Sequence, residues 1–286
     1  MNKRRYLYLL PLFFLIIVII LGWLATNYLG NKARQEIIKE NRASLLTISV
    51  YVSGTLNGVE NAIKTLADSP RISAVLQTRE NSEIAHVNRI LDRYNSAFSS
   101  VAYMMDTSGL TLASSNRSDP DSFVGHSYGF RPYFNEALNG HAGRYFAIGV
   151  TSGKRGFYAS YPVLKPSGEV IGVVAMKKDL DDIEPFFRKF PYCFFVSPEG
   201  IVFISSKPDM VTKSLWPLDK NSREKLIVSR QFGDKFSKAI YKKEIADGTE
   251  ISFENNRYWT SRKFIGSDGW SILLLTSTDR IGVYRL

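Results

Sequence analysis

The sequence has few of the residues from which metal and disulfide sites are built. Its 286 residues include one cysteine, Cys193, and three histidines, His86, His126 and His141, which are scattered without the spacing of metal ligands. A single cysteine excludes an internal disulfide, and the histidine pattern gives no reason to expect a metal centre. The sequence therefore predicts no metal site and no cofactor.

Signatures of catalysis and of nucleic-acid binding are also missing. The chain has no G-x-S-x-G nucleophile elbow and no H-E-x-x-H helix, so we expect no catalytic residues and no enzyme activity in this chain. The 37 Lys and Arg residues exceed the 27 Asp and Glu residues, which gives a net charge of +10. Because no lysine-rich tract or recognition module accompanies this excess, nucleic acid is not an expected partner.

A long uncharged run near the N-terminus predicts a membrane anchor. Residues 6–26 read YLYLLPLFFLIIVIILGWLAT, and about 20 apolar residues suffice to cross a bilayer as a helix. Lys3, Arg4 and Arg5 precede the run, which places residues 1–27 as a cytoplasmic tip and transmembrane helix in the inner (cell) membrane. Residues after about 27 are then periplasmic or extracellular. A cleaved signal peptide is the alternative, but the run exceeds the usual length and no clean A-x-A site follows.

The next segment, residues 28–75, has the pattern of one long helix. Apolar residues recur every seven positions, at Ile38, Leu45, Val52, Val59 and Leu66, and no proline intervenes before position 70. The stripe predicts a signalling helix that either pairs with a second copy in a homodimer or lies along its own domain. Pairing is the more attractive reading for the membrane-proximal part, which has no obvious domain to cover.

The remaining chain contains an internal repeat. The hairpin pattern VAYMMDTSGLTLASSN (101–116) matches YCFFVSPEGIVFISSK (192–207), and the strand pair at 156–179 matches the one at 256–279. A second helical segment over 83–98 precedes the first unit. We therefore expect two tandem lobes, over 76–188 and 189–286, each a mixed antiparallel sheet with flanking helices.

One arginine in the first lobe stands among aromatic residues. The stretch SYGFRPYFNEALNGHAGRYF places Arg131 between Tyr128, Phe130, Tyr133 and Phe134. A guanidinium can hold a carboxylate through two charge-assisted bonds, and surrounding rings strengthen those bonds by lowering the local dielectric. The pattern indicates an anion site, unless the arginine pairs with an internal acid such as Glu136 or Asp179.

Further candidates follow in the same lobe. Strand alternation in IGVVAMKKDL requires one of Lys177 and Lys178 to point inward, where a second cation suits a second carboxylate. The turn TSGKRG offers the hydroxyls of Thr151 and Ser152, and Tyr158 on the next strand can close a wall. Lys177 has Ser277 at its repeat position, so the first lobe is the one equipped for an anion.

Taken together, these features resemble the double Cache family of extracytoplasmic sensor domains, in which a long helix carries two PAS-like lobes. Within that family the sequence is most similar to the periplasmic domains of C4-dicarboxylate sensor histidine kinases, through Tyr128, Arg131, Tyr133, Phe134, the Thr151-Ser152 turn and Lys177. The resemblance implies an α+β fold, a ligand-binding distal lobe, a choice of Lys177 as the inward lysine, and a homodimer through the long helix. The expected ligand-binding residues also include Phe130, Gly149 and Ser160.

The resemblance also implies a ligand and an output. Amino-acid-binding relatives generally carry an aspartate where this sequence has Lys177, which favours a dicarboxylate such as succinate, fumarate or malate. The parent protein is then a sensor histidine kinase whose catalytic module is not in this chain. The alternatives are a lobe that senses an amino acid or monocarboxylate for a diguanylate cyclase or chemoreceptor, and a structural module that senses nothing.

Overall fold

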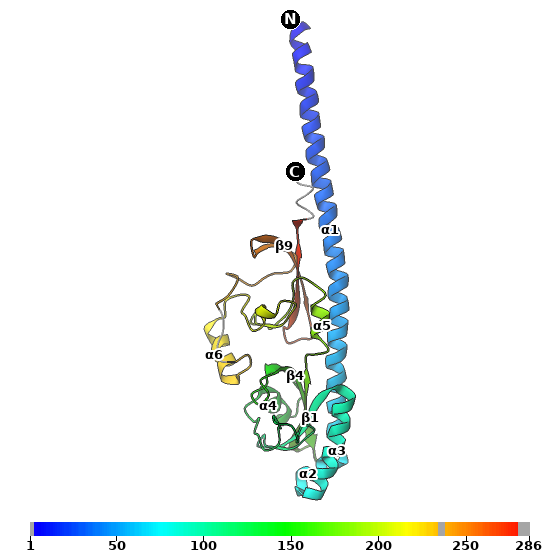
Figure 1. Cartoon of the computed structure of the whole chain (residues 1–286), viewed down its shortest axis with the longest axis vertical. Helices are drawn as coiled ribbons and strands as arrows, with labels where there is room; N and C mark the ends of the chain where they lie inside the picture. The colour runs from blue at the N-terminus through cyan, green and yellow to red at the C-terminus, as the bar shows by residue number, and fades with distance from the viewer. Residues whose placement is uncertain (1–2, 234–237, 280–286) are drawn as a thin grey trace.

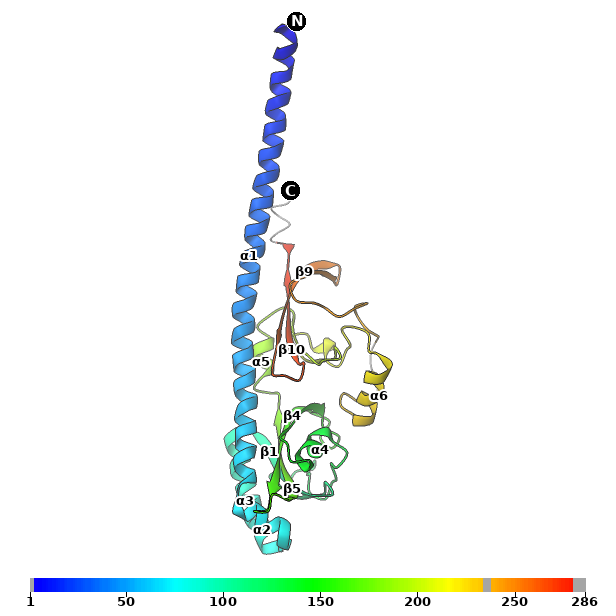
Figure 2. The ribbon, with the colours of Figure 1, turned by 180° about the vertical axis from the view of Figure 1, so that it is seen from behind.

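In the computed structural model, which describes residues 3–233 and 238–279, one long helix carries two lobes side by side along its length (Figure 1). This helix, α1, spans Lys3–Ala67. Its N-terminal part projects beyond both lobes, and the lobe farthest from that end is formed by the first half of the remaining chain (Figure 2). We call the two lobes distal and proximal by their position relative to this projecting end.

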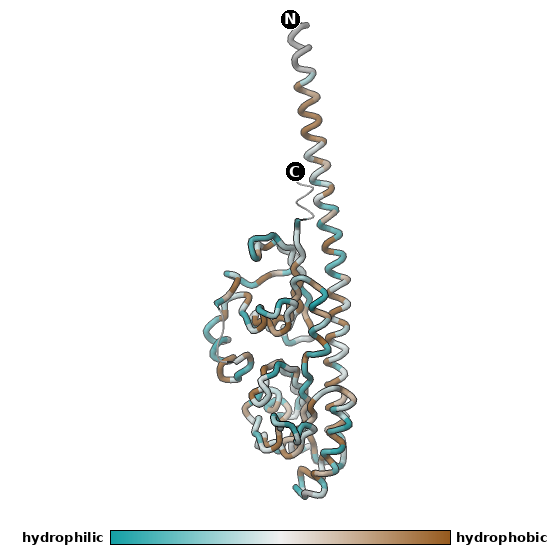
Figure 3. Tube along the Cα trace, in the orientation of Figure 1, coloured by the Kyte–Doolittle hydropathy of each residue, from teal (hydrophilic) through white to brown (hydrophobic). Residues whose placement is uncertain are grey.

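The projecting part of α1 has the properties of a membrane span. Figure 3 shows it as a continuous hydrophobic stretch, and its most apolar window of 18 residues has a mean hydropathy of 2.3 with none of the window buried in the protein. Large apolar side chains such as Phe13 and Ile19 are exposed here. Exposure of such a surface is unfavourable in water and favourable in lipid, so the helix fits the expected anchor.

The heptad stripe of α1 packs against the protein's own lobes. Leu45, Val52, Val59 and Leu66 are all buried, and α1 contacts strands of both lobes. The reading in which this stripe faces a second copy is therefore wrong for these positions, and the proximal lobe covers the part that seemed to have no domain beside it. The opposite face of the helix, over the residues whose burial is described, remains open to a partner.

The long helix ends earlier than position 75. Asp68 and Ser69 interrupt it, and α2, Pro70–Thr78, begins at the proline, a residue that fits the first turn of a helix because it lacks an N–H. The expected boundary between 75 and 76 consequently falls inside α2. The boundary between 188 and 189 falls just after α5, Glu184–Phe187, at the junction of the lobes.

The distal lobe is an antiparallel five-stranded sheet with helices on both sides. Its strand order is β2-β1-β5-β4-β3, so β2 and β3 form the two edges. In chain order its elements after α2 are α3 (Asn81–Phe98), β1 (Ser100–Asp106), β2 (Thr111–Ser114), α4 (Pro132–Leu138), β3 (Gly143–Ile148), β4 (Arg155–Leu164) and β5 (Val170–Asp179).

The proximal lobe repeats this topology. Its sheet has the order β7-β6-β10-β9-β8, which matches the distal order strand for strand. After α5 its elements are β6 (Cys193–Val196), β7 (Val202–Ser205), the 3-10 helix η1 (Pro208–Met210), α6 (Lys220–Ser229), β8 (Glu250–Phe253), β9 (Asn256–Phe264) and β10 (Ser271–Ser277).

The register confirms the internal repeat at single-residue level. Tyr158 is paired with Lys177 in the distal sheet, and Tyr258 is paired with Ser277 in the proximal sheet. Both first hairpins turn on a glycine with positive φ, Gly109 at 84° and the equivalent residue of the second lobe at 94°. A side chain is strongly disfavoured at such angles, which explains the glycine in both copies.

Among the described residues, three apolar clusters hold the molecule together. The largest runs along α1 and joins one face of both sheets, from Leu45 through Phe146 and Phe195 to Trp270. The second covers the opposite face of the distal sheet, and the third covers the opposite face of the proximal sheet. The two lobes thus share one core with the helix, while each keeps a separate core on its outer face.

Asp106, at the end of β1, is a hydrogen-bond acceptor whose charge affects the stability of the fold. Its Oδ1 accepts hydrogen bonds from the N–H groups of Ser108 and Leu110 at 2.9 and 3.1 Å, and its Oδ2 accepts one from Arg79 at 2.9 Å. Burial alone raises the pKa of Asp106, but a hydrogen bond from the Ser108 hydroxyl and the bonds just described outweigh it and lower the pKa below its usual value. The charged form therefore stabilises the fold.

We expect Asp106→Asn to lower the free energy of unfolding by about 1–2 kcal/mol at pH 7, because a charge-assisted acceptor is lost. The deficit is complete above the unfolded pKa of about 3.9 and shrinks as the pH falls through the lower folded pKa, since the wild-type side chain then becomes neutral too. Urea denaturation at pH 7 and at low pH measures it. Asp209→Asn, at an exposed ion pair with Lys213, is the matched control, and equal deficits for both variants would contradict the assignment.

Candidate functional site

The expected site lies on the outer face of the distal sheet, away from α1. Val173 and Ala175 of β5 belong to the outer cluster, whereas Val174 and Met176 belong to the core along the helix. By the alternation of a strand, Lys177 shares the outer face and Lys178 the helix face. The structure accordingly places Lys178 against the Phe98 carbonyl at 3.1 Å, behind the sheet.

A small cavity lies on this face. Its volume is about 10 Å³, close to the minimum that holds one water molecule. Admission of a larger molecule therefore requires the surrounding loops to move. The lining residues are Tyr103, Phe123, Tyr128, Arg131, Tyr133, Gly149, Val150, Thr151 and Tyr158, of which six were expected from the sequence.

Tyrosine hydroxyls form most of the polar lining. The Tyr103 hydroxyl donates to that of Tyr133 at 2.8 Å, and the rings of Tyr133 and Tyr158 stack with centroids 5.2 Å apart. The hydroxyls of Tyr128 and Thr151 lie 2.8 Å apart and join the two loops over the cavity. Burial raises the pKa of Tyr103, Tyr133 and Tyr158, so all three are neutral hydrogen-bond donors at physiological pH.

Arg131 is the charged member of the lining. It is 1% exposed and immediately precedes α4, where Pro132 starts the helix. Its Nη2 donates to the Ile148 carbonyl at 2.8 Å, and its Nη1 donates to the Ser229 carbonyl at 3.0 Å. The ring of Phe130 lies 5.2 Å from its guanidinium carbon. Its partners are thus neutral carbonyls and not the carboxylates of Glu136 or Asp179.

Lys177 occupies the same face but is engaged elsewhere. Its ammonium group forms an ion pair with Asp179, and its alkyl chain passes over Gly156, where an added Cβ would lie 3.1 Å from the lysine chain. It does not line the cavity. Of the two expected cations, Arg131 therefore lines the cavity. Lys177 lies beside the cavity and is paired with Asp179.

The structure places the other expected residues around the cavity. Ser160 is buried, and its hydroxyl donates to the Tyr133 carbonyl at 2.6 Å, which ties α4 to the sheet. The Ser152 hydroxyl accepts from the Lys154 N–H at 3.3 Å within the β3–β4 loop. Phe130 is half exposed and covers Arg131 from outside. These residues support the lining and do not form it.

Three lining residues were not expected. Tyr103 on β1 is paired with Ala175, so it shares the outer face of the sheet. Tyr103 alternates along β1 with Val101 and Met105, which indicates that all three share one face. Only the pairing of β1 with β5 shows that this is the outer face. Phe123 and Val150 come from loops, for which the sequence gives no comparable indication.

The chemistry of the lining favours an anion. One guanidinium and several neutral hydroxyl donors face the cavity, and within residues 3–233 and 238–279 no acidic side chain lines it. Neutral donors and a buried cation stabilise negative charge in a low-dielectric site. Among the described residues there is no group of three or more His, Cys, Asp or Glu that could hold a metal ion.

The equivalent face of the proximal lobe is filled by hydrophobic side chains. Trp216 packs against Gly200 so closely that a Cβ there would lie 2.4 Å from the indole ring. Leu273 and Leu275 lie where the distal strand has Val173 and Ala175, and Ser277 lies where it has Lys177. The proximal face therefore lacks the cationic, hydroxyl-lined arrangement of the distal face in the residues described for it.

Comparison with known proteins agrees with this architecture. The sequence profile of the Cache domain matches residues 30–282. The chain belongs to the Cache domain family. Its match to the crystal structure of the sensor domain of the V. cholerae histidine kinase DctB has a TM-score of 0.78 and 27% identity, and covers 85% of this chain and 98% of that one. The double-lobe fold expected from the sequence is confirmed.

Two related proteins are also named DctB, like the V. cholerae kinase. The C4-dicarboxylate transport sensor protein DctB of Pseudomonas aeruginosa PAO1 is 25% identical over 83% of this chain, and that of Rhizobium meliloti 1021 is 33% identical over 59%. The matches cover 37% and 27% of those proteins, so this Cache chain spans about a third of their length.

A more distant structural match shows the fold alone. The ligand-binding domain of the Pseudomonas aeruginosa PAO1 amino acid chemoreceptor PctC in complex with GABA has a TM-score of 0.55 and 18% identity, over 87% of this chain and 98% of that one.

Gly149 provides a test of how tightly this Cache site is packed. A Cβ at this position would lie 2.6 Å from the Ser152 hydroxyl and 2.9 Å from the Tyr158 hydroxyl. We expect Gly149→Ala to lower the free energy of unfolding by about 1–3 kcal/mol through overpacking. The control is Gly58→Ala, where an added Cβ meets nothing within 4 Å inside a helix and should stabilise by up to about 1 kcal/mol. Thermal denaturation of both measures the difference, and equal shifts would contradict this packing.

Proposed function

We propose that this chain is the extracytoplasmic sensing region of a membrane-anchored signalling receptor and that its distal lobe binds a small carboxylate. A C4-dicarboxylate is the favoured ligand, and a sensor histidine kinase is the favoured parent protein, as in the DctB relatives. Lys3, Arg4 and Arg5 before the apolar helix favour a cytoplasmic N-terminus. Ligand binding would act by favouring one of two conformations of the distal lobe.

The observation that carries the proposal is the charge of the cavity lining. Arg131 is buried and bonded to uncharged carbonyls, so its positive charge has no acidic counterpart among the lining residues. A buried charge without a counterion is costly, and a carboxylate that accepts from its remaining N–H groups would remove part of that cost. The neutral hydroxyls of Tyr128, Tyr133 and Tyr158 can orient the same anion.

The second carboxylate of a C4 ligand has a candidate partner in Lys177. Tyr158, which lines the cavity, is paired directly with Lys177 in the sheet. A dianion would take the place of Asp179 beside the lysine ammonium. The Asp179 side chain is 33% exposed, so it can turn into water, and the ligand carboxylate would then be the counterion of the Lys177 ammonium, whose side chain is 2% exposed.

Asp179 also supports the alternative ligand class. In an amino acid complex Arg131 would hold the carboxylate, and Asp179 would accept hydrogen bonds from the ammonium group. The two ligand classes therefore assign opposite roles to one carboxylate: it competes with a dicarboxylate and it binds an amino acid.

Calorimetry with dicarboxylates, monocarboxylates and amino acids on residues 28–286 separates these cases. For succinate we expect Arg131→Ala to weaken binding about 100-fold or more, through loss of charge-assisted bonds, and Lys177→Ala about 10-fold. Asp179→Asn should leave succinate binding equal or tighter. For an amino acid the same Asp179→Asn change should weaken binding more than about 10-fold.

Arg188→Ala is the matched control, since this arginine is 62% exposed and pairs with Glu184 at the surface. It should leave binding unchanged. Succinate binding that survives both Arg131→Ala and Lys177→Ala would remove the site assignment. Binding of amino acids alone would replace the ligand class.

The homodimer is also a proposal, now through the open face of α1. Leu46 and Val50 are 55% and 63% exposed, and Ala43 and Gly54 lie on the same exposed stripe. Spacings of three and four residues place them on one side of a helix. An added Cβ at Gly54 would meet nothing within 4 Å, so the protein's own packing does not require glycine there. Close approach of a second helix would account for it.

We expect Val50→Asp to shift residues 28–286 from dimer to monomer by at least about 10-fold in dissociation constant, because it places a charge in an apolar contact. The matched control is Lys220→Asp, which adds the same acidic residue at an exposed lysine of α6, on the side of the molecule away from α1. Analytical ultracentrifugation measures both. A dimer that withstands Val50→Asp, or monomers at all concentrations in the wild type, would exclude this interface.

A further inference from the structure

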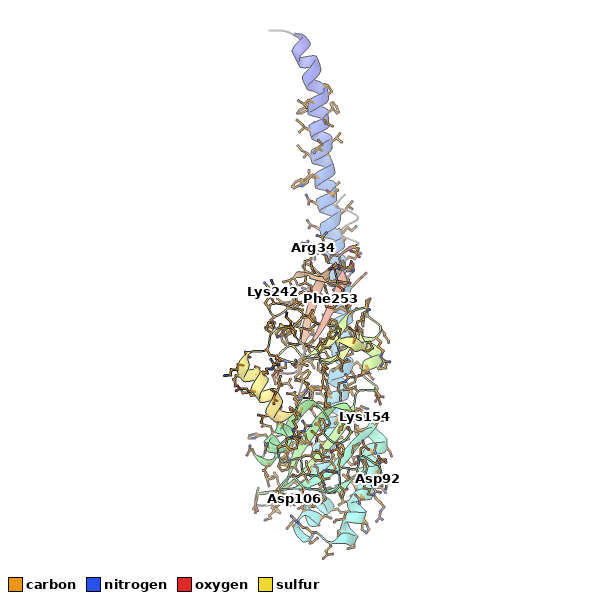
Figure 4. The ribbon with its side chains drawn as sticks, turned by 60° about the vertical axis from the view of Figure 1, so that its left-hand side comes forward. Arg34, Asp92, Asp106, Lys154, Lys242 and Phe253 are labelled. Atoms are coloured by element: carbon orange, nitrogen blue, oxygen red, sulfur yellow. The ribbon has the colours of Figure 1, made fainter. Side chains whose placement is uncertain are left out.

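A helix of the proximal lobe reaches the ligand site of the distal lobe. Figures 1 and 2 both show α6 on the same side of the molecule as α4, at the level where the lobes meet. In Figure 4, Lys154 of the β3–β4 loop lies at this junction, whereas Asp106 lies at the far end of the distal lobe. The loop that closes the cavity therefore faces the proximal lobe.

The residues after α6 add to the edge of the distal sheet. The Ile148 N–H donates to the Gln231 carbonyl at 2.8 Å, and the Gln231 side-chain amide donates to the Phe146 carbonyl at 2.8 Å. Because β3 is an edge strand, its outer N–H and C=O groups have no partner within its own sheet. Gln231 thus supplies two bonds that the distal lobe cannot make by itself.

Arg131 joins the same contact from the side of the cavity. Ser229 is the last residue of α6 and Arg230 is its C-cap, and their carbonyls accept from Arg131 Nη1 at 3.0 and 3.4 Å. The last carbonyls of a helix lack partners within it and carry the negative end of its dipole. The end of α6 is therefore a suitable neutral partner for a buried guanidinium.

The segment is anchored between the lobes by Phe232. This residue is 3% exposed, and its ring lies 5.8 Å from Phe203 and 6.2 Å from Trp270. Trp270 in turn contacts Phe146 of β3 at 4.5 Å. The segment Ser229–Phe232 is accordingly held by the shared core at one end and by the distal site at the other.

We propose that the segment Ser229–Phe232 is a working part of the ligand site, with Gln231 as a positioning residue that keeps Arg131 and β3 in binding geometry. Three of the five N–H donors of Arg131 are taken by the carbonyls of Ile148, Ser229 and Arg230, which fixes the plane of the guanidinium and leaves two donors for a carboxylate. The inference rests on the proposed function, because it assigns a regulated contact to that same site.

The contact couples ligand binding to the proximal lobe. If docking of the segment improves the affinity for a carboxylate, then the carboxylate must improve docking by the same factor. The ligand thereby stabilises the contact between α6 and β3. Ligand binding in the distal lobe then changes the stability of a contact made by the proximal lobe, although the ligand does not touch that lobe.

The test uses the full chain in detergent with succinate as the probe. Gln231→Ala removes the bond to the Phe146 carbonyl and should weaken succinate binding about 2- to 10-fold, the usual effect of one hydrogen bond. Hydrogen–deuterium exchange of the peptide that contains Ile148 should slow on addition of succinate, and slow less in Gln231→Ala. Gln77→Ala is the matched control, since its side-chain amide also makes a local bond, to Ser73 in α2, far from the site.

A second arm needs no ligand. Arg131→Ala should speed exchange of the same Ile148 peptide, whereas peptides of α2, at the far end of the distal lobe (Figure 1), should keep their rates. Unchanged exchange in Arg131→Ala overturns the inference.

Succinate binding with an unaltered Kd in Gln231→Ala and unaltered Ile148 exchange overturns the inference but leaves the proposed function intact. If no carboxylate or amino acid binds, the proposed function fails. The ligand coupling then fails with it, and the Arg131→Ala arm alone decides whether the arginine holds the segment.

Discussion

The Arg131 guanidinium is a full positive charge removed from water, and three backbone carbonyls from two segments hold it. One carbonyl comes from the end of β3 and two from the end of α6. Burial of an ion is tolerated only where donors and acceptors are matched around it. This guanidinium therefore constrains three elements. Arg131 directly precedes α4, and its hydrogen bonds require the ends of β3 and α6 to lie beside it.

The alternation of β5 separates two kinds of contact within one strand. Lys177 lies on the face with the tyrosines, and Lys178 lies on the face toward the helices, where it bonds to the carbonyl of Phe98. A displacement of β5 on its outer face therefore moves side chains that pack on α1. The sheet, with one face on the site and the other on the helix, is the physical connection between them.

Much of the fold could be predicted because it follows from local pattern. The uncharged run, the strand alternation around Lys177 and the repeated hairpins each depend on residues close in sequence. The pairing of Tyr158 with Lys177 and of Tyr258 with Ser277 shows that even the repeat alignment was correct to the residue. The difference between Lys177 and Ser277 at one repeat position then predicted that the first lobe is the one equipped for an anion.

The remaining features depend on contacts between distant segments. A heptad stripe reads the same whether a second helix or a sheet covers it, so Leu45 could not reveal that its own lobe lies there. Asp179 is close to Lys177 in sequence, yet only the side-chain geometry shows that they pair. Nothing near Ser229 indicates that its carbonyl meets an arginine 98 residues earlier.

The length of α1 has a purely mechanical consequence. From Ala67 back to residue 28 the helix runs about 60 Å at 1.5 Å per residue. Each degree of tilt about Ala67 therefore moves residue 28 by about 1 Å. The displacement at residue 28 for a given tilt is proportional to the length of the helix.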